Sequence, residues 1–286
     1  MVVRIVFGIF FLCVCLVILV VFYDMTHVKV VYYRILSKKI EKSVRIALVS
    51  DLHNYRLGEK NQVLLDAIDR EKPDVVISAG DLITSGDRGR YQNALILCEE
   101  LVKKYPFYYG LGNHETKIRE REDYYGDFYQ RMEADLHKIG VSMLHNQVFT
   151  IPDTGIVLYG LELPLRFFDK VNEVNCSKKD IQNLVGEADQ KAFNLLIGHN
   201  PEFFEAYMDW GADLVVSGHQ HGGIVRLPFL GGLVSARLQL FPKYDGGLFS
   251  ADTGHMVISR GLGTHTIPVR FHNPCELVVI DLEKEM

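Results

Sequence analysis

The sequence of 286 residues has only five cysteines, one tryptophan and nine prolines, and neither sign of charge dominates it. Cys13 and Cys15 lie in an apolar run near the N-terminus, and the other three cysteines are isolated along the chain. Because no C-x-x-C pair occurs, the sequence indicates neither a zinc knuckle nor a disulfide framework. The formal net charge of −5 provides no basic face, which argues against nucleic acid as a partner.

Charge is also missing from residues 5–23, a run of 19 mostly apolar residues. A helix of that length, rising about 1.5 Å per residue, just crosses the hydrocarbon core of a bilayer. A cleaved secretory signal is the alternative, but its apolar part is usually shorter and ends at small residues. This run ends at "VFYDMTH". We therefore expect residues 1–24 to form an uncleaved single-pass anchor in the cell membrane.

The charges flanking this run leave the side of the membrane open. Arg4 precedes the run, and several basic residues come after it, namely Lys29, Arg34, Lys38, Lys39 and Lys42. The positive-inside rule favours a cytoplasmic domain, whereas single N-terminal anchors often export the domain attached to them. We expect residues 25–40 to be a basic linker and residues 41–286 to form one folded domain.

Apolar runs and helical patterns alternate after the linker. Predicted strands at "VRIALVS", "DVVISAG" and "FYYGLG" are separated by the amphipathic patterns "EKNQVLLDAIDREK" and "RYQNALILCEELVKK". This βαβ alternation is typical of a parallel or mixed sheet covered by helices. The second half has successive short strands instead, in "VSMLHNQVFTI", "GIVLYGLEL", "AFNLLIG", "ADLVVSG", "HMVISRG" and "CELVVIDL". We predict a mixed α/β (α+β) protein with two sheets.

Several of these apolar runs end in residues that can bind a metal. The residues are Asp51 and His53, Asp81, Asn113 and His114, His199, and His219 and His221. Any one of them is explained by a turn or a hydrogen-bonded surface histidine. Catalytic groups in α/β sheets gather at the carboxyl ends of the strands, so the whole set predicts one cluster.

Carboxylate and amide oxygens together with imidazoles suit manganese, iron or zinc, and the absence of thiolates argues against a structural zinc site. The two oxygens of Asp81 could bridge two ions about 3.5–4 Å apart. We therefore expect two divalent metal ions as cofactors, without a choice among the three elements.

The same residues carry a family resemblance. Asp51-x-His53, Gly80-Asp81, Gly112-Asn113-His114-Glu115, His199 and Gly218-His219-x-His221 match, in order, the five blocks of the calcineurin-like metallophosphoesterases. The segments "GHQHGGIVRLP", "YDGGLF" and "ISRGLGTHTIPVRFHNPCEL" resemble its bacterial membrane-associated, YkuE/YaeI-like branch. The resemblance implies a two-sheet β-sandwich flanked by helices, with residues 41–286 as the catalytic domain.

The resemblance also implies roles for individual residues. One metal would be held by Asp51, His53, Asp81 and His221, and the other by Asp81, Asn113, His199 and His219. A hydroxide bridging the metals would attack phosphorus in line. His114 would face the substrate as general acid or as a donor to the phosphoryl oxygen, and Glu115 would orient a neighbour.

The substrate stays open, because this fold serves many phosphoesters. A membrane tether favours lipid-linked or envelope phosphoesters; a UDP-sugar-lipid pyrophosphate or a nucleotide is an alternative substrate. A catalytically inactive scaffold on the same fold is the alternative function. Intact Asp51, Asp81 and His114 argue against it.

Two further regions are candidate substrate contacts. Arg260 and His265 in "SRGLGTH" could touch the substrate or stabilise a turn. The segment 224–249 could form an apolar groove or a membrane-facing flap, or simply pack on its own domain; it carries Leu227, Phe229, Leu230, Leu233, Leu238, Leu240 and Phe241 with Arg226, Arg237 and Lys243. We expect structural roles for the remaining histidines, His27, His137, His145, His255 and His272.

Overall fold

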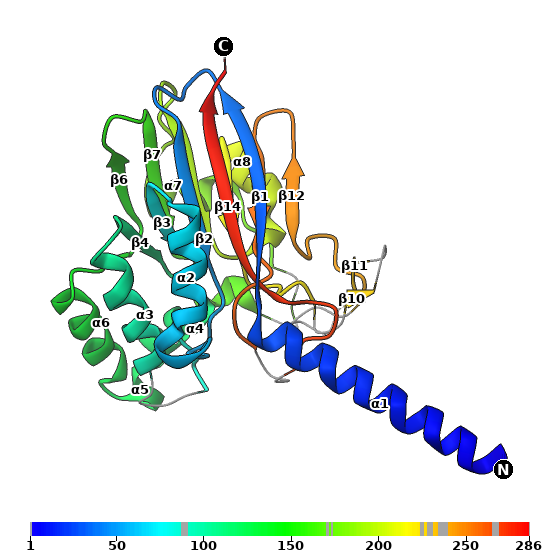
Figure 1. Cartoon of the computed structure of the whole chain (residues 1–286). Helices are drawn as coiled ribbons and strands as arrows, with labels where there is room; N and C mark the ends of the chain where they lie inside the picture. The colour runs from blue at the N-terminus through cyan, green and yellow to red at the C-terminus, as the bar shows by residue number, and fades with distance from the viewer. Residues whose placement is uncertain are drawn as a thin grey trace.

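A computed structural model describes residues 2–86, 91–169, 172, 174–223, 226–227, 231–233, 240–264 and 269–285. Two six-stranded sheets form a sandwich, helices cover its outer faces, and one long helix projects from the domain (Figure 1). This arrangement confirms the predicted α/β fold with two sheets and flanking helices.

The first sheet has the strand order β1-β14-β2-β3-β4-β5. Its strands are β1 (Val28–Ser37), β14 (Cys275–Lys284), β2 (Val44–Val49), β3 (Val75–Ser78), β4 (Phe107–Gly110) and β5 (Ser142–Leu144). β2, β3, β4 and β5 pair in parallel, and the βαβ alternation predicted the first three of these strands. β14 is antiparallel to β2, with Val278 opposite Leu48.

The segment expected to be a basic linker differs from the expectation, because it contains β1. This strand pairs in parallel with β14 along its whole length, from Val28 opposite Cys275 to Ser37 opposite Lys284. The reason lies in "VKVVYYRILS", which combines β-branched and aromatic residues and so suits a half-buried strand. The lysines and arginine that suggested a linker lie among these strand-forming residues.

The second sheet has the strand order β12-β13-β9-β8-β7-β6. Its strands are β12 (Gly247–Ser250), β13 (His255–Ile258), β9 (Leu214–Ser217), β8 (Phe193–Gly198), β7 (Ile156–Leu161) and β6 (Gln147–Ile151). Only His145 and Asn146 separate β5 of the first sheet from β6 of the second. A two-stranded ribbon, β10 (Arg226–Leu227) and β11 (Gly231–Gly232), lies apart from both sheets.

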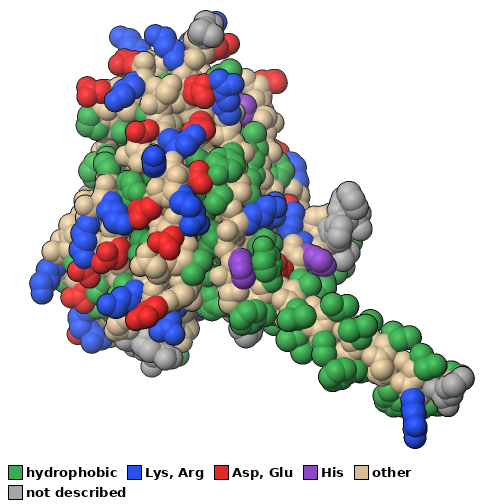
Figure 2. Space-filling view, viewed as in Figure 1, with side chains coloured by type: hydrophobic (Ala, Val, Ile, Leu, Met, Phe, Trp, Pro, Cys, Tyr) green, Lys and Arg blue, Asp and Glu red, His purple; other side chains and the backbone are tan. Residues whose placement is uncertain are grey.

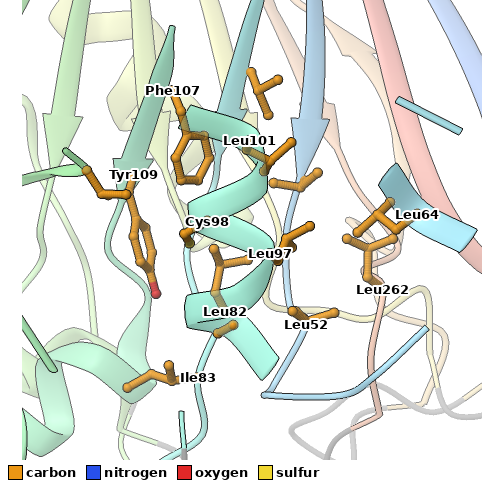
Figure 3. Close-up of a cluster of buried hydrophobic side chains, with 14 of the residues drawn as sticks. Leu52, Leu64, Leu82, Ile83, Leu97, Cys98, Leu101, Phe107, Tyr109 and Leu262 are labelled. Atoms are coloured by element: carbon orange, nitrogen blue, oxygen red, sulfur yellow. The ribbon is translucent and has the colours of Figure 1, made fainter. Parts of the chain in front are cut away.

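Helices cover both sheets. They are α2 (Gln62–Glu71), α3 (Gln92–Val102), α4 (Asn113–Glu120), α5 (Glu122–Tyr125), α6 (Phe128–Lys138), α7 (Lys178–Val185) and α8 (Phe204–Trp210), with 3₁₀ turns η1 (Glu59–Asn61), η2 (Leu165–Phe168) and η3 (Pro201–Phe203). Side chains such as Ile46 and Ile197 fill the space between the sheets. A second core lies under α3, where Leu97 and Leu101 are fully buried (Figure 3).

Helix α1 (Val2–Thr26) is the one helix in the described part of the chain that is long and apolar enough to cross a membrane. None of its most apolar window is buried by the protein. Figure 2 shows hydrophobic side chains along its length, whereas charged side chains are spread over the domain. An apolar helix exposed in this way near the N-terminus is typical of a membrane span and of a signal sequence.

Candidate metal centre

The polar strand-end residues come together at one end of the sandwich. Asp51 and His53 follow β2, Asp81 follows β3, His199 follows β8, and His219 and His221 follow β9. Three groups have their ligand atoms within 4.8 Å of one another: Asp51, His53 and His221; Asp81, His199 and His219; and His53, Asp81 and His114. Shared members connect the third group to the other two, so the groups form one continuous centre.

The closest atoms converge as ligands of a cation do. Nε2 of His199 lies 3.1 Å from Oδ2 of Asp81, and Nε2 of His221 lies 3.5 Å from Oδ1 of Asp51. The Nε2 atoms of His53 and His221 are 2.9 Å apart. Two imidazole nitrogens that converge beside a carboxylate fit a divalent ion with nitrogen and oxygen ligands.

Asn113 supplies an independent test of this fit. Its Oδ1 is buried and has no hydrogen-bond partner in the described part of the chain. Asn113 lines the same cavity as His53 and His114. A buried acceptor without a partner costs about 1–3 kcal/mol, and a cation would satisfy it.

The backbone at this centre is strained. Five residues of the cluster adopt positive φ angles between 49° and 71°, namely Asp51, His53, Asp81, His219 and His221. Non-glycine residues in this region cost about 1–3 kcal/mol each and persist where the surrounding structure enforces them, often at functional sites. The strain turns polar side chains from several strand ends toward one point.

Two glycines allow the carboxylates to approach the backbone closely. A Cβ atom at Gly218 would collide with Oγ of Ser50 and Oδ2 of Asp51, and one at Gly112 would collide with Oδ1 of Asp81. The space instead permits hydrogen bonds from the backbone N–H of His219 to Asp51, 3.1 Å, and from that of His114 to Asp81, 2.8 Å. Glycine is required here by close contact.

Asn113 and His114 begin a helix rather than simply ending a strand. They form the first turn of α4, whose N-cap is Gly112. Oε2 of Glu115 accepts hydrogen bonds from the N–H groups of Gly112 and Asp81, both 3.0 Å, and Oε1 accepts one from the Tyr109 hydroxyl, 2.6 Å. Glu115 therefore orients its neighbours, as the sequence suggested.

The buried charges perturb one another strongly. Burial raises the pKa of Asp51 to about 6, with opposition from the nearby His199. Burial also pushes the pKa of Asp81 upward, but His199, His114 and other imidazoles outweigh it and hold that pKa well below its usual range. Burial lowers the pKa of His199, yet Asp81 outweighs burial and raises it to about 9. Such a concentration of desolvated charge is typical of functional sites.

His114 is oriented by Ser85. Its Nδ1 accepts a hydrogen bond of 2.8 Å from the Ser85 backbone N–H, and the Ser85 Oγ lies 2.9 Å from the same nitrogen. Nε2 of His114 lies 3.9 Å from Oδ2 of Asp81. The ring thus presents Nε2 toward the centre.

A cavity of about 540 Å³ opens onto the cluster. It is lined by His53, Thr84, Ser85, Gly86, Asn113, His114, Lys117, Leu165, Phe168 and Thr264. The Phe168 ring packs edge-on against His219, with 5.4 Å between centroids. Polar groups and an aromatic wall that converge in this way are typical of a ligand site.

The remaining candidate substrate contacts are either absent from the described lining of the cavity or outside the described residues. Arg260 packs against Gly222, its Nε lies 3.2 Å from the buried Glu276, and it is not among the described residues that line the cavity. His265 lies outside the described residues, as do Phe229, Leu230, Arg237, Leu238 and the side chain of Leu227. Leu240 and Phe241 are described and exposed.

The sequence did not identify Ser85, Lys117 or Phe168 as part of the cavity. Ser85 lies in "GDLITSG", a few residues after Asp81, and Lys117 lies one helical turn after His114. Proximity to a predicted ligand was the only indication for Ser85 and Lys117. Phe168 had none, because it belongs to a short turn after β7 that has no periodic pattern.

Two sheets with a cluster of aspartate, asparagine and histidine at their shared end define a metal-dependent hydrolase architecture. The family model of the calcineurin-like phosphoesterases matches residues 44–223. The chain belongs to this family and is a phosphoester hydrolase.

Several bacterial proteins are similar to this chain over most of their length. The metallophosphoesterase YkuE of Bacillus subtilis (strain 168) is 24% identical, over 84% of this chain and 79% of YkuE. The phosphodiesterase YaeI of Escherichia coli (strain K12) is 24% identical, over 77% of this chain and 75% of YaeI. The UDP-2,3-diacylglucosamine pyrophosphatase LpxG of Chlamydia muridarum (strain MoPn / Nigg) is 25% identical, over 83% of each chain.

Proposed function

We propose that this chain is a membrane-tethered hydrolase that acts on lipid-linked phosphoesters with two divalent metal ions. One ion would be held by Asp51, His53, Asp81 and His221, and the other by Asp81, Asn113, His199 and His219. Bound there, manganese, iron or zinc would activate water and neutralise charge on the phosphoryl oxygens. The buried Oδ1 of Asn113, without a partner among the described residues, supports a cation at this position.

The protein's own groups would orient the phosphoester and handle a proton. Since Nδ1 of His114 accepts the Ser85 N–H bond, the proton of the neutral ring resides on Nε2. Nε2–H would donate to the phosphoryl oxygen or protonate the leaving oxygen. Phe168 and Leu165 line the cavity and would exclude water from one side of the substrate.

The single observation that carries the tethered function is the connection between α1 and the centre. The Asp24 carboxylate, near the end of α1, accepts a hydrogen bond of 2.9 Å from the Asn273 backbone N–H. The Asn273 side chain donates to the carbonyl oxygen of His221, 2.7 Å. The Tyr55 hydroxyl also donates to the carbonyl oxygen of Met25, 3.2 Å.

Sheet register gives the same relationship. β1 begins opposite Cys275, at the start of β14, and β14 runs antiparallel to β2, so the start of β1 lies at the carboxyl end of β2. The helix that would enter the bilayer therefore leaves the domain at the end that bears the cluster (Figure 1). A substrate anchored in the same bilayer would meet the site at high effective concentration.

The test uses the full chain in lipid nanodiscs, first with bis(p-nitrophenyl) phosphate as a water-soluble probe. We expect turnover that a chelator abolishes and added manganese restores. Absence of turnover with manganese, iron and zinc would favour the inactive scaffold. Carbonate-resistant retention in the membrane fraction tests the tether, and release into the supernatant would refute it. Lipid-linked and soluble phosphoesters are then compared at equal concentration.

A further inference from the structure

A second cavity adjoins the metal centre. Its volume is about 390 Å³, and it is lined by Ser85, Gly86, Lys117, Arg121, Tyr124 and Tyr125. Ser85, Gly86 and Lys117 line the first cavity as well. A ligand at the metal centre could therefore extend past His114 into this space.

Two cations, one on α4 and one just after it, face the second cavity. Lys117 lies on α4, Arg121 is the C-cap residue that follows this helix with non-helical backbone angles, and both residues line the cavity. Arg119, between them in sequence, instead points its guanidinium to Glu162, 2.9 Å away. The cavity is thus a place where an overall acidic chain presents positive charge.

The two cations differ in how far they are neutralised. Nε of Arg121 lies 3.0 Å from the Asp123 carboxylate. The Lys117 ammonium forms no ion pair or hydrogen bond with any residue that the structure describes. Lys117 also lies at the junction of the cavities, so its charge faces both the metal centre and the second cavity.

Two aromatic rings form another part of the wall. Tyr124 and Tyr125 pack edge to face, with 4.8 Å between ring centroids. Tyr124 is 56% exposed. Its exposed ring surface can contact a planar or apolar group that follows an anion, because aromatic faces stack on bases and hydrocarbon alike.

We propose that the second cavity binds a second phosphate, so that the preferred substrates contain a P–O–P linkage. The inference rests on the proposed function and specifies its substrate class. Water would add its oxygen to the scissile phosphorus, and the bond from that phosphorus to the bridging oxygen would break. The second phosphate would leave with the bridging oxygen and its electron pair, and Nε2 of His114 would supply a proton. Lys117 and Arg121 would hold the departing phosphate.

A phosphate monoester would make less use of the second cavity than a pyrophosphate. Its single phosphate would occupy the metal centre and leave the second cavity to an uncharged group, for which two converging cations offer no specific contact. A pyrophosphate places its second anion one bond beyond the bridging oxygen, on the side of His114 where Ser85 and Lys117 join the two cavities. The tyrosines would then contact the carrier of that phosphate, a nucleoside or a lipid.

The experiment compares three probes with the full, metal-loaded chain in nanodiscs: p-nitrophenyl phosphate, UDP-glucose and farnesyl diphosphate. We expect the Lys117→Met, Arg121→Met double variant to lower kcat/KM for at least one two-phosphate probe, relative to p-nitrophenyl phosphate, about tenfold or more. When Lys117→Arg replaces Lys117→Met in this double variant, most of that ratio should return, because arginine keeps the charge. Lys179→Met, at an exposed position of α7, is the matched control and should leave all ratios unchanged.

The tyrosines identify the carrier. A Tyr124→Ala, Tyr125→Ala double variant that selectively loses UDP-glucose activity by about fivefold or more indicates a nucleoside carrier. A selective loss of farnesyl diphosphate activity indicates a lipid carrier, and either result supports the second-phosphate site. A change below about twofold for both two-phosphate probes in the Lys117→Met, Arg121→Met variant would overturn it. Failure of the parent chain to hydrolyse these three probes and bis(p-nitrophenyl) phosphate would instead refute the proposed function.

Discussion

The backbone N–H of Ser85 donates a hydrogen bond of 2.8 Å to Nδ1 of His114. A ring nitrogen that accepts a hydrogen bond carries no proton, so neutral His114 holds its proton on Nε2. A backbone donor cannot be removed by a side-chain substitution, which makes this orientation robust. The bond favours a proton-donating role over a metal-binding one, because the Nε2 that faces the centre carries the proton of the neutral ring.

We predict that His114→Ala lowers kcat for bis(p-nitrophenyl) phosphate by roughly 100-fold or more, as expected when a general acid is lost. Metal content, measured by plasma mass spectrometry, should stay within error of the parent. Ser85→Ala is the matched control, since it removes Oγ but keeps the N–H, and we expect a loss of at most about fivefold. Loss of bound metal in His114→Ala would show that this imidazole is a ligand.

Asn113 gives a prediction about the amide ligand. Asn113→Ala removes the buried Oδ1 and should weaken metal binding by about tenfold or more, in the range of other perturbed metal sites. Asn113→Asp keeps an oxygen ligand and should retain metal. Its added negative charge should raise KM for anionic phosphoesters. Titration of the metal-free chain with manganese measures both effects, and equal affinity in Asn113→Ala and the parent would remove Asn113 from the centre.

Metal removal should lower stability as well as activity. The centre holds buried carboxylates and strained residues that a cation would stabilise, and a ligand at 100 times its Kd adds about 2.7 kcal/mol. For a domain of this size, that corresponds to a fall in Tm of roughly 5–10 °C on chelation. Differential scanning calorimetry with and without chelator measures it. Asp81→Asn should abolish most of the difference, whereas Lys179→Met should preserve it.

The parts of the fold that the sequence predicted are those with local patterns. The strands β2, β3 and β4 follow from apolar runs, and the clustering of polar residues follows from their positions after the strands of both sheets. β1 was missed because its partner β14 lies about 250 residues away. The Ser85–His114 bond and the Asp24–Asn273 bond were also beyond sequence reasoning, because tertiary packing alone brings these residues together.

His145 provides a prediction about pH that is independent of the metal centre. Its Nδ1 lies 3.1 Å from Glu162 and its Nε2 lies 2.8 Å from Glu133. Burial lowers the pKa of His145, but the two carboxylates together outweigh burial and raise that pKa. For Glu162 the signs are opposite. Burial raises its pKa, but His145 and Arg119 outweigh burial and lower that pKa.

The signs of these shifts define a pH window. A raised histidine pKa contributes stability that is fully present below the ordinary value near 6.5 and is lost as pH rises through the folded value. A lowered glutamate pKa contributes stability that is present above the ordinary value near 4.5 and is lost as pH falls through the folded value. The ionised pair should therefore stabilise the fold most between these two ordinary values.

We predict that His145→Gln lowers the free energy of unfolding by about 1 kcal/mol near pH 5.5, a value reduced from that of a buried pair because the site is partly exposed. The difference from the parent should shrink as pH rises above the folded pKa of His145, since the parent imidazole then loses its charge. Urea unfolding of the metal-free chain at pH 5.5, 7 and 9 measures this difference, and His137→Gln, at the end of α6, is the matched control. A difference that stays constant or grows with pH would mean that His145 stabilises the fold as a neutral side chain.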